Sequence, residues 1–195
     1  MSNHSDERSE LHWAVMENDI KTISALLSNG ENPNTVDEQG WTPLMTAASA
    51  GFAQICDLLL QNGALSDKET KEGRCAFFYA ASRCNIQVVD LFLQNGICCW
   101  KKDKFGDTPL HRALSNEKCS IPLLTMFKER CDLLGKPAPF NVTDADGNLP
   151  IHIACYENRR DLAQWIVDNI PGASFRQAKN KSGKFPEELF SNSVH

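Results

Sequence analysis

The stretch DKFGDTPLHRAL, residues 103–114, has the composition of a turn followed by the start of a helix. Thr108 can cap a helix, and Pro109 stands at the first helical position, where the missing N–H of proline removes no hydrogen bond. Leu110 and Ala113, three residues apart, would then face a core. Many helices begin this way, so the fold depends on whether the arrangement recurs.

The arrangement recurs in three other stretches: DEQGWTPLMTAA at 37–48, KEGRCAFFYAA at 71–81 and DADGNLPIHIAC at 144–155. Two series of glycines share a period of 33 residues: Gly40, Gly73 and Gly106, and Gly30, Gly63 and Gly96. SELHWAV at 9–15 and KSGKFPEELF at 181–190 are partial copies at the two ends. A period of about 33 residues with the pattern T-P-L-H-x-A is the ankyrin-repeat signature, so the chain is identified as a member of the ankyrin-repeat proteins.

This pattern predicts an all-α ankyrin-repeat solenoid of about five helix–turn–helix repeats plus a C-terminal cap. We expect one domain over residues 9–190, because repeats that share a core with their neighbours have no globular size limit. The expected repeats lie near 7–39, 40–72, 73–105, 106–146 and 147–182, with the cap at 183–190. Residues 1–8 and 191–195 are expected to be flexible tails.

Each repeat should contain a β-turn finger, a first helix and an antiparallel second helix. In the second repeat, we expect Leu44, Ala47 and Ala48 to face inward and Gly51 to end the first helix. The second helix then carries an apolar stripe of Ile55, Leu58, Leu59 and Leu60. A small alanine recurs where paired helices approach, at positions 14, 47, 80, 113 and 154. The ankyrin resemblance implies that the recurring histidines hydrogen-bond neighbouring backbone: His12, His111 and His152.

Two repeats depart from the pattern. The fourth is eight residues over length, and the spacing of its apolar residues from about Ser120 onward predicts a second helix lengthened by up to two turns. The extra length is either a tolerated surface insertion or a ridge that a partner grips. The third repeat has Cys75 and Ala76 in place of Thr-Pro, so we expect a weaker helix entrance there, offset by packing of its aromatic residues.

Composition argues against several classes of protein. No window approaches 18 consecutive apolar residues and the opening residues are polar, so we expect neither secretion nor a membrane span. The net charge is −5 and no basic stripe is present, so we expect no nucleic-acid partner. Eight cysteines without C-x-x-C spacing indicate a reducing compartment and no zinc ribbon. Five of them lie in helical patterns and are expected to be small buried residues: Cys56, Cys75, Cys84, Cys119 and Cys155.

Motifs of nucleotide-binding, hydrolase and metalloprotease sites are missing from the sequence. We therefore expect no catalytic residue, no cofactor and no metal, and a monomer in the cytosol with nuclear entry left open. The alternative from another class is an enzyme with a site assembled from distant residues. Charge is also uneven along the chain: residues 1–99 carry six Lys and Arg against thirteen Asp and Glu, and residues 100–195 carry fourteen against twelve. This gradient is either accidental or matches a long protein partner of opposite charge order.

The ankyrin resemblance implies that finger tips and the exposed face of the first helices hold proteins. The repeat register assigns to that face Trp13, Glu17, Trp41, Thr46, Tyr79, Arg83, Lys104, Asp107, Arg112, Asn116, Tyr156 and Glu157. Trp, Tyr and Arg carry the greatest weight because these residues dominate binding hot spots. The alternative for the two tryptophans is ordinary packing, at the N-terminal end of the core for Trp13 and against the next finger for Trp41.

WKKDKFGDTPLHRAL at 100–114 and GWTPLMTAASAG at 40–51 also resemble repeats of the gankyrin family, the proteasome regulatory-particle assembly chaperones. That resemblance implies that the chain cradles the C-terminal domain of a proteasomal ATPase subunit on its concave face, with charged finger residues steering the encounter. The nearest alternatives are an ankyrin inhibitor of a kinase and a substrate adaptor of a ubiquitin ligase.

Overall fold

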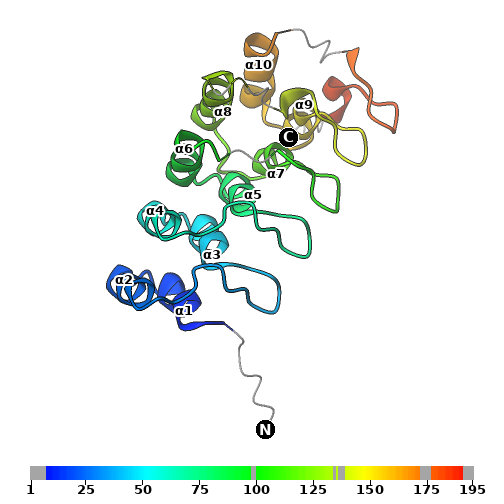
Figure 1. Cartoon of the computed structure of the whole chain (residues 1–195). Helices are drawn as coiled ribbons and strands as arrows, with labels where there is room; N and C mark the ends of the chain where they lie inside the picture. The colour runs from blue at the N-terminus through cyan, green and yellow to red at the C-terminus, as the bar shows by residue number, and fades with distance from the viewer. Residues whose placement is uncertain (1–7, 98–99, 134, 136–138, 172–176, 191–195) are drawn as a thin grey trace. The chain divides into compact units, whose positions relative to one another are not determined.

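The computed structural model describes residues 8–97, 100–133, 135, 139–171 and 177–190, and within these ranges it contains helices and turns but no strand (Figure 1). The first three helix pairs are α1 (Glu10–Met16) and α2 (Ile20–Ser28), α3 (Pro43–Ala50) and α4 (Ala53–Gln61), and α5 (Ala76–Ser82) and α6 (Ile86–Gln94). The next two are α7 (Pro109–Leu114) and α8 (Ile121–Leu133), and α9 (Pro150–Tyr156) and α10 (Arg160–Asn169). Two short 3-10 helices follow α8 and α10: η1 (Pro139–Asn141) and η3 (Pro186–Leu189). The predicted all-α helical-repeat class is confirmed.

The contacts divide the chain into two compact units. The N-terminal unit is Met1–Ala80 with Asn85–Cys99, and the C-terminal unit is Ala81–Cys84 with Trp100–His195. The single domain over 9–190 stays a prediction. The predicted tails lie outside the described residues except for Arg8, as do Cys98, Cys99 and Leu134.

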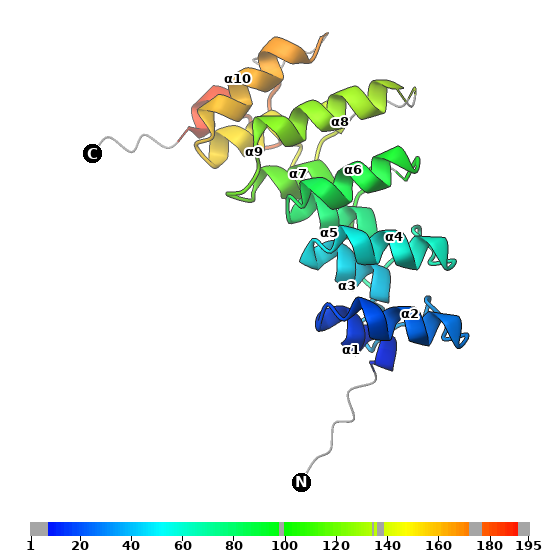
Figure 2. The ribbon, with the colours of Figure 1, turned by 90° about the vertical axis from the view of Figure 1, so that its left-hand side faces the viewer.

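In the N-terminal unit, α1 packs against α2 and α3, α3 against α4, and α4 against α6 (Figure 2). The interior is formed by fully buried side chains from these helices, among them Leu11, Leu44, Ile55 and Phe92. Leu58 and Leu60 of the predicted stripe are only half-buried, because they flank Leu59, which points directly into the core.

The entrance and the end of α3 form as the sequence predicts. The Thr42 Oγ1 accepts a hydrogen bond from the Met45 N–H at 3.2 Å, and Pro43 occupies the first helical turn. Gly51 ends the helix in the left-handed region with φ +85°, and a Cβ there would lie 3.1 Å from the Asn85 side chain. Asn85 uses the space to donate to the carbonyls of Ala48 and Ser49 at 2.8 and 3.0 Å, which satisfies the last turn of α3.

In the C-terminal unit, α7 packs against α9, α8 against α10, and α9 against α10, η1 and η3. Helix α8 has 13 residues where α2, α4 and α6 have nine, so the predicted lengthening amounts to about one turn. The lengthened α8 does not account for all the extra residues of the fourth repeat. Some of the others pack into the core, since Phe140 of η1 is buried with its ring 6.0 Å from that of Trp165. The insertion is therefore partly built into the fold.

Two sequence expectations about the third repeat have opposite outcomes. Helix α5 begins at Ala76 without Thr-Pro, and Phe77, Phe78 and Tyr79 are all buried, which agrees with the expected aromatic packing. Cys75 and Cys119 are buried as expected but lie just outside the helices, and the expectation of a buried helical cysteine is wrong for Cys84. That residue lies in the turn after α5 with φ +58° and is only half-buried, because the helix has already ended at Ser82.

Candidate protein-binding surface

Four of the finger turns are held by a carboxylate or an amide at their first position. The Asp103 Oδ1 accepts the N–H groups of Phe105 at 2.9 Å and Asp107 at 3.0 Å, while the backbone N–H of Asp103 donates to the Asp107 carbonyl at 2.8 Å. The same arrangement recurs at Asp37, Asp144 and Asn180. An Asx side chain that binds backbone two and four residues later fixes a tight turn, so these four fingers present their tip residues in a defined conformation.

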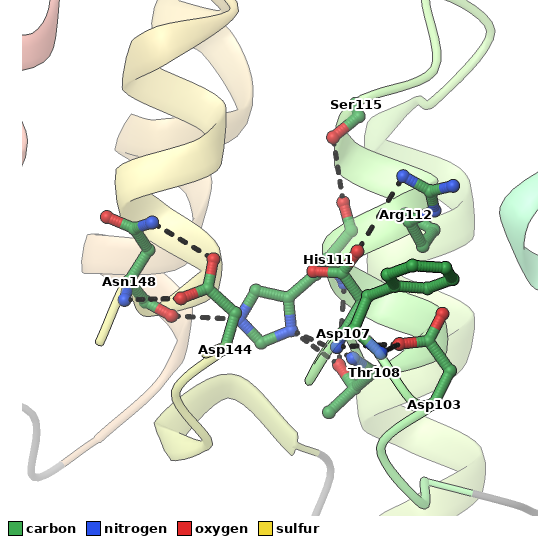
Figure 3. Close-up of polar contacts among 9 residues, drawn as sticks. Asp103, Asp107, Thr108, His111, Arg112, Ser115, Asp144 and Asn148 are labelled. Carbon is green, nitrogen blue, oxygen red and sulfur yellow. Dashed lines mark hydrogen bonds and ion pairs between the residues drawn. The ribbon is translucent and has the colours of Figure 1, made fainter. Parts of the chain in front are cut away.

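The recurring histidines connect successive fingers, as the ankyrin resemblance implies. Their Nε2 atoms lie 2.9–3.1 Å from backbone carbonyls further along the chain. His12 bonds Trp41 and His111 bonds Asn148, each in the next repeat, and His152 bonds Ala178, two residues before the last Asx turn at Asn180. A carbonyl oxygen only accepts, so Nε2 carries the proton in each ring. Figure 3 shows the His111 ring between the Asn148 carbonyl and Thr108, whose Oγ1 lies 2.7 Å from Nδ1.

This tautomer defines the electrostatics of the buried rings. Nδ1 is left as an acceptor, and at His152 it receives the Leu149 N–H at 3.1 Å. Burial lowers the pKa of His111 and of His152, because the charged ring would lose its hydration, and the backbone hydrogen bonds oppose this only in part. His111 and His152 are therefore neutral connectors within the fold, and the residues at the finger tips remain to make contacts with other molecules.

In the N-terminal unit, the predicted binding face includes Trp13 on α1. Its side chain is 41% exposed, and the Arg8 guanidinium lies 5.5 Å from the ring centroid. Met16, one turn further along α1, is also exposed. Glu17 is exposed next to Met16. Trp13 therefore offers an exposed aromatic surface, and the buried part of its side chain also agrees with the alternative of packing at the N-terminal end of the core.

Trp41 of the second finger and Tyr79 of α5 form an aromatic pair in the N-terminal unit. Their ring centroids lie 4.2 Å apart, and the Tyr79 hydroxyl lies 3.4 Å from Thr70 Oγ1. Tyr79 is only 8% exposed, so it presents little surface to a partner and its assignment to the binding face is corrected. Trp41 is half-buried, which fits the packing alternative, and the Thr46 hydroxyl bonds the Thr42 carbonyl at 3.3 Å.

In the C-terminal unit, Lys104, Asp107 and Arg112 lie on the same finger and its helix. Arg112 Nη1 is 3.6 Å from the Asp107 carboxylate (Figure 3). Burial raises the pKa of Asp107 while Arg112 opposes this rise. Lys104 and Arg112 are exposed, so this finger displays two cations around a partly buried acid.

The remaining predicted residues of the C-terminal unit differ in accessibility. Tyr156 at the end of α9 is 68% exposed, and Glu157 and Arg83 are exposed as well. Asn116 is half-buried and acts within the fold, donating to the Ser82 carbonyl at 3.0 Å and accepting from the Lys118 N–H at 2.9 Å. Asn116 is therefore a scaffold residue of its repeat.

Phe105 is an exposed residue that the register did not assign to the face. It stands at the tip of the fourth finger, 63% exposed, directly after Lys104. The signal was present in the sequence, because a phenylalanine inside the turn DKFGD cannot reach a core from a finger tip. Within the described residues, no helix is both long and apolar enough to span a bilayer. No group of three or more His, Cys, Asp or Glu side chains in those same ranges is placed to hold a metal ion.

Comparison with known proteins agrees with this architecture. Residues 11–103 match the family described as "Ankyrin repeats (3 copies)". The chain is 31% identical over 194 residues to the "Probable 26S proteasome regulatory subunit p28" of Saccharomyces cerevisiae, an alignment that covers 97% of this chain and 82% of the relative. It is 46% identical over 55 residues to the "26S proteasome non-ATPase regulatory subunit 10" of Dictyostelium discoideum, which covers 28% of this chain and 24% of that protein.

Proposed function

Because the chain belongs to the ankyrin-repeat family of the yeast regulatory subunit p28, we propose that it is a non-catalytic scaffold that holds a protein subunit of the proteasome regulatory particle. The C-terminal domain of a proteasomal ATPase subunit is the partner that we propose, and assembly of the particle is the process. The observation that carries the proposal is the 31% identity that extends over 97% of this chain and 82% of the yeast relative. A match of this extent involves the whole set of repeats.

The surface chemistry supports a protein partner. Trp13 and Met16 give the N-terminal unit an exposed apolar contact on one face of α1. Large aromatic side chains of this kind provide much of the binding energy in protein interfaces, because they bury a large area with little loss of conformational entropy. A partner segment with an apolar side chain would cover this contact.

The fourth finger of the C-terminal unit supports a charged component of the same interface. Lys104 and Arg112 are exposed, and Phe105 stands between them in sequence at the tip. Cations on an exposed rim accelerate encounter with an acidic surface and lose this effect at high salt. We propose that the ATPase domain presents carboxylates to this finger.

The experiment measures binding kinetics between the full chain and purified C-terminal domains of the proteasomal ATPase subunits at two ionic strengths. Trp13→Ala should speed dissociation roughly thirty-fold, the equivalent of about 2 kcal/mol, because a desolvated anchor is lost. Lys104→Glu should slow association and flatten its salt dependence. Trp13 is preferred over Trp41, since the ring of Trp41 also supports Tyr79.

Lys128→Glu is the matched control, because Lys128 lies on α8, where it pairs with Asp132 at 3.1 Å. It should leave both rate constants unchanged, and all variants should unfold as the parent chain does. If Lys128→Glu weakens binding as much as Lys104→Glu, the partner grips the lengthened α8 and the assigned face is rejected. If no ATPase C-terminal domain binds the folded parent chain, the proposed partner is rejected.

A further inference from the structure

Cys84 occupies a backbone position that does not favour cysteine. The equivalent residue also has a positive φ in three other repeats: Gly51 at +85° and Asn158 at +56°, each eleven positions after a finger glycine, and Asn18 at +56°, one period of 33 residues before Gly51. Glycine and asparagine tolerate the left-handed conformation, whereas other side chains are strained in it. Cys84 adopts it with φ +58°. A strained residue that the fold retains is a reason to examine what its side chain does.

The thiol of Cys84 faces a second thiol in the same C-terminal unit. Each side chain is a hydrogen-bond partner of the other, and the Cys84 Sγ also lies 3.6 Å from the Ala113 carbonyl. Cys119, in the turn between α7 and α8, is only 2% exposed, whereas Cys84 is half-buried. The pair is therefore enclosed on the Cys119 side and reaches solvent through Cys84.

A fixed positive charge lies beside Cys119. The Arg159 guanidinium donates to the Cys119 carbonyl at 2.6 Å and to the Glu117 carbonyl at 3.2 Å, which holds it against the turn. The hydrogen bond from Cys84 lowers the pKa of Cys119, and Arg159 lowers it further against the effect of burial. The same hydrogen bond and burial raise the pKa of Cys84, so Cys84 keeps its proton and donates it towards Cys119.

Two other buried cysteines, Cys56 and Cys155, have a different environment. Burial raises the pKa of the Cys56 thiol and that of the Cys155 thiol to about 12. Since the thiolate is the nucleophile in cysteine chemistry, the raised pKa makes these two thiols weaker nucleophiles near neutral pH. Cys155 lies in the same unit as the pair and provides an internal reference.

We propose that Cys84 and Cys119 form an oxidisable dithiol, a modification site that hydrogen peroxide converts to an intrachain disulfide. The Cys119 thiolate attacks one peroxide oxygen, forming an S–O bond as the O–O bond breaks, and the released hydroxide takes the Cys84 proton to give water. The Cys84 thiolate then attacks the Cys119 sulfur, forming the S–S bond as hydroxide leaves, and that hydroxide takes the proton lost earlier by Cys119. Two thiols and one peroxide yield one disulfide and two waters.

The disulfide would join the end of α5 to the turn before α8, across 35 residues of chain. Closing a loop of this length removes conformational freedom from the unfolded chain, so the oxidised protein should resist unfolding more than the reduced one. The inference does not depend on the proposed partner, because every group in it belongs to this chain.

The test treats the full, reduced chain with hydrogen peroxide and maps its cross-links without reduction. Trypsin leaves Cys84 on one peptide with Cys98 and Cys99, so the mapping uses a chain carrying Cys98→Ser and Cys99→Ser. The expected product is a single link between the peptides that begin at Cys84 and Cys119, with two thiols lost and Cys155 still reduced. The oxidised chain should also need more denaturant to unfold than the reduced chain.

Cys84→Asn is the matched control, since asparagine occupies the same backbone position in the first and fifth repeats. It should fold at least as well as the parent in the reduced state, form no link, and show no gain in stability on oxidation. The proposal is overturned if peroxide leaves the pair unlinked in the folded parent chain. It is equally overturned if the Cys155 thiol is oxidised as fast as the Cys119 thiol, or if Cys119 forms a disulfide with a cysteine other than Cys84.

Discussion

At the scale of single residues, the same histidine position serves as a connector in three repeats. Each ring donates from Nε2 to a backbone carbonyl further along the chain, at 3.0 Å for His12, 2.9 Å for His111 and 3.1 Å for His152. The imidazole is useful there because one ring carries both a donor and an acceptor and can bond two backbone segments at once. This use requires the neutral form, which links the stability of the repeats to pH.

We therefore predict that the chain loses stability as it is acidified. Burial holds the pKa of His111 and of His152 below the ordinary value of 6.5, so near and below that value the unfolded chain binds more protons than the folded one. The contribution of these two histidines to the free energy of unfolding should be greatest above about pH 6.5. It should fall as the pH drops from there through the pKa values that His111 and His152 have in the folded chain. Denaturant titrations at a series of pH values measure this, and His111→Gln should reduce the slope. A free energy of unfolding that stays level or rises on mild acidification contradicts the prediction.

At the scale of elements, sequence reasoning succeeds where the cause is local. The Thr42 and Thr108 caps, the adjacent prolines and the Asx turns at Asp37 and Asp103 are all determined by residues within four positions. The sequence predicts the caps, the prolines and a turn at the start of residues 103–114, because each needs only a known pattern of donors and acceptors along one stretch of chain, whereas the role of the Asp37 and Asp103 carboxylates comes from the structure.

Sequence reasoning fails where the cause is a contact between distant residues. Tyr79 is buried because Trp41 covers its ring, and the two residues are 38 positions apart. Cys84 has Cys119 as its partner at a separation of 35 positions. The 33-residue repeat pattern predicts neither this pair nor the pair of Trp41 and Tyr79. The period places residues on equivalent positions, but the identity of the neighbour decides whether a position is exposed, buried or reactive.

The spacing between neighbouring fingers gives a prediction at the same scale. Gly106 and Gly183 both have positive φ, at +84° and +75°, but a Cβ at Gly106 would lie 2.7 Å from the Ala145 backbone N, whereas at Gly183 it would meet nothing within 4 Å. Gly106→Ala should therefore destabilise the chain by about 1–3 kcal/mol more than Gly183→Ala, because it forces the fourth and fifth fingers apart. Both variants carry the cost of a side chain at positive φ, so the difference between them isolates the contact. Equal losses in thermal unfolding would refute the close packing of these fingers.

At the scale of the whole molecule, the two compact units share one continuous helix. Helix α5 runs from Ala76 to Ser82, and the division between the units falls inside it, after Ala80. The chain then returns to the N-terminal unit at Asn85, where the Asn85 side chain bonds the end of α3. Melting either unit would therefore disrupt backbone hydrogen bonds of a helix that contributes to both, and in repeat proteins such sharing between neighbours produces cooperative unfolding.

This sharing predicts that the chain unfolds in one transition. The tryptophans supply a reporter in each unit, with Trp41 in the first and Trp165 in the second. One variant keeps only Trp41 and a second keeps only Trp165, with phenylalanine at the other tryptophans. The unfolding midpoint reported by Trp41 in the first variant should equal the midpoint reported by Trp165 in the second. Leu44→Ala removes a fully buried side chain from the N-terminal unit, at a cost of about 2–5 kcal/mol, and should lower the midpoint reported by Trp165 as well as that reported by Trp41. A shift seen by Trp41 alone would mean that the units unfold independently, and the expectation of one domain over 9–190 would then be wrong.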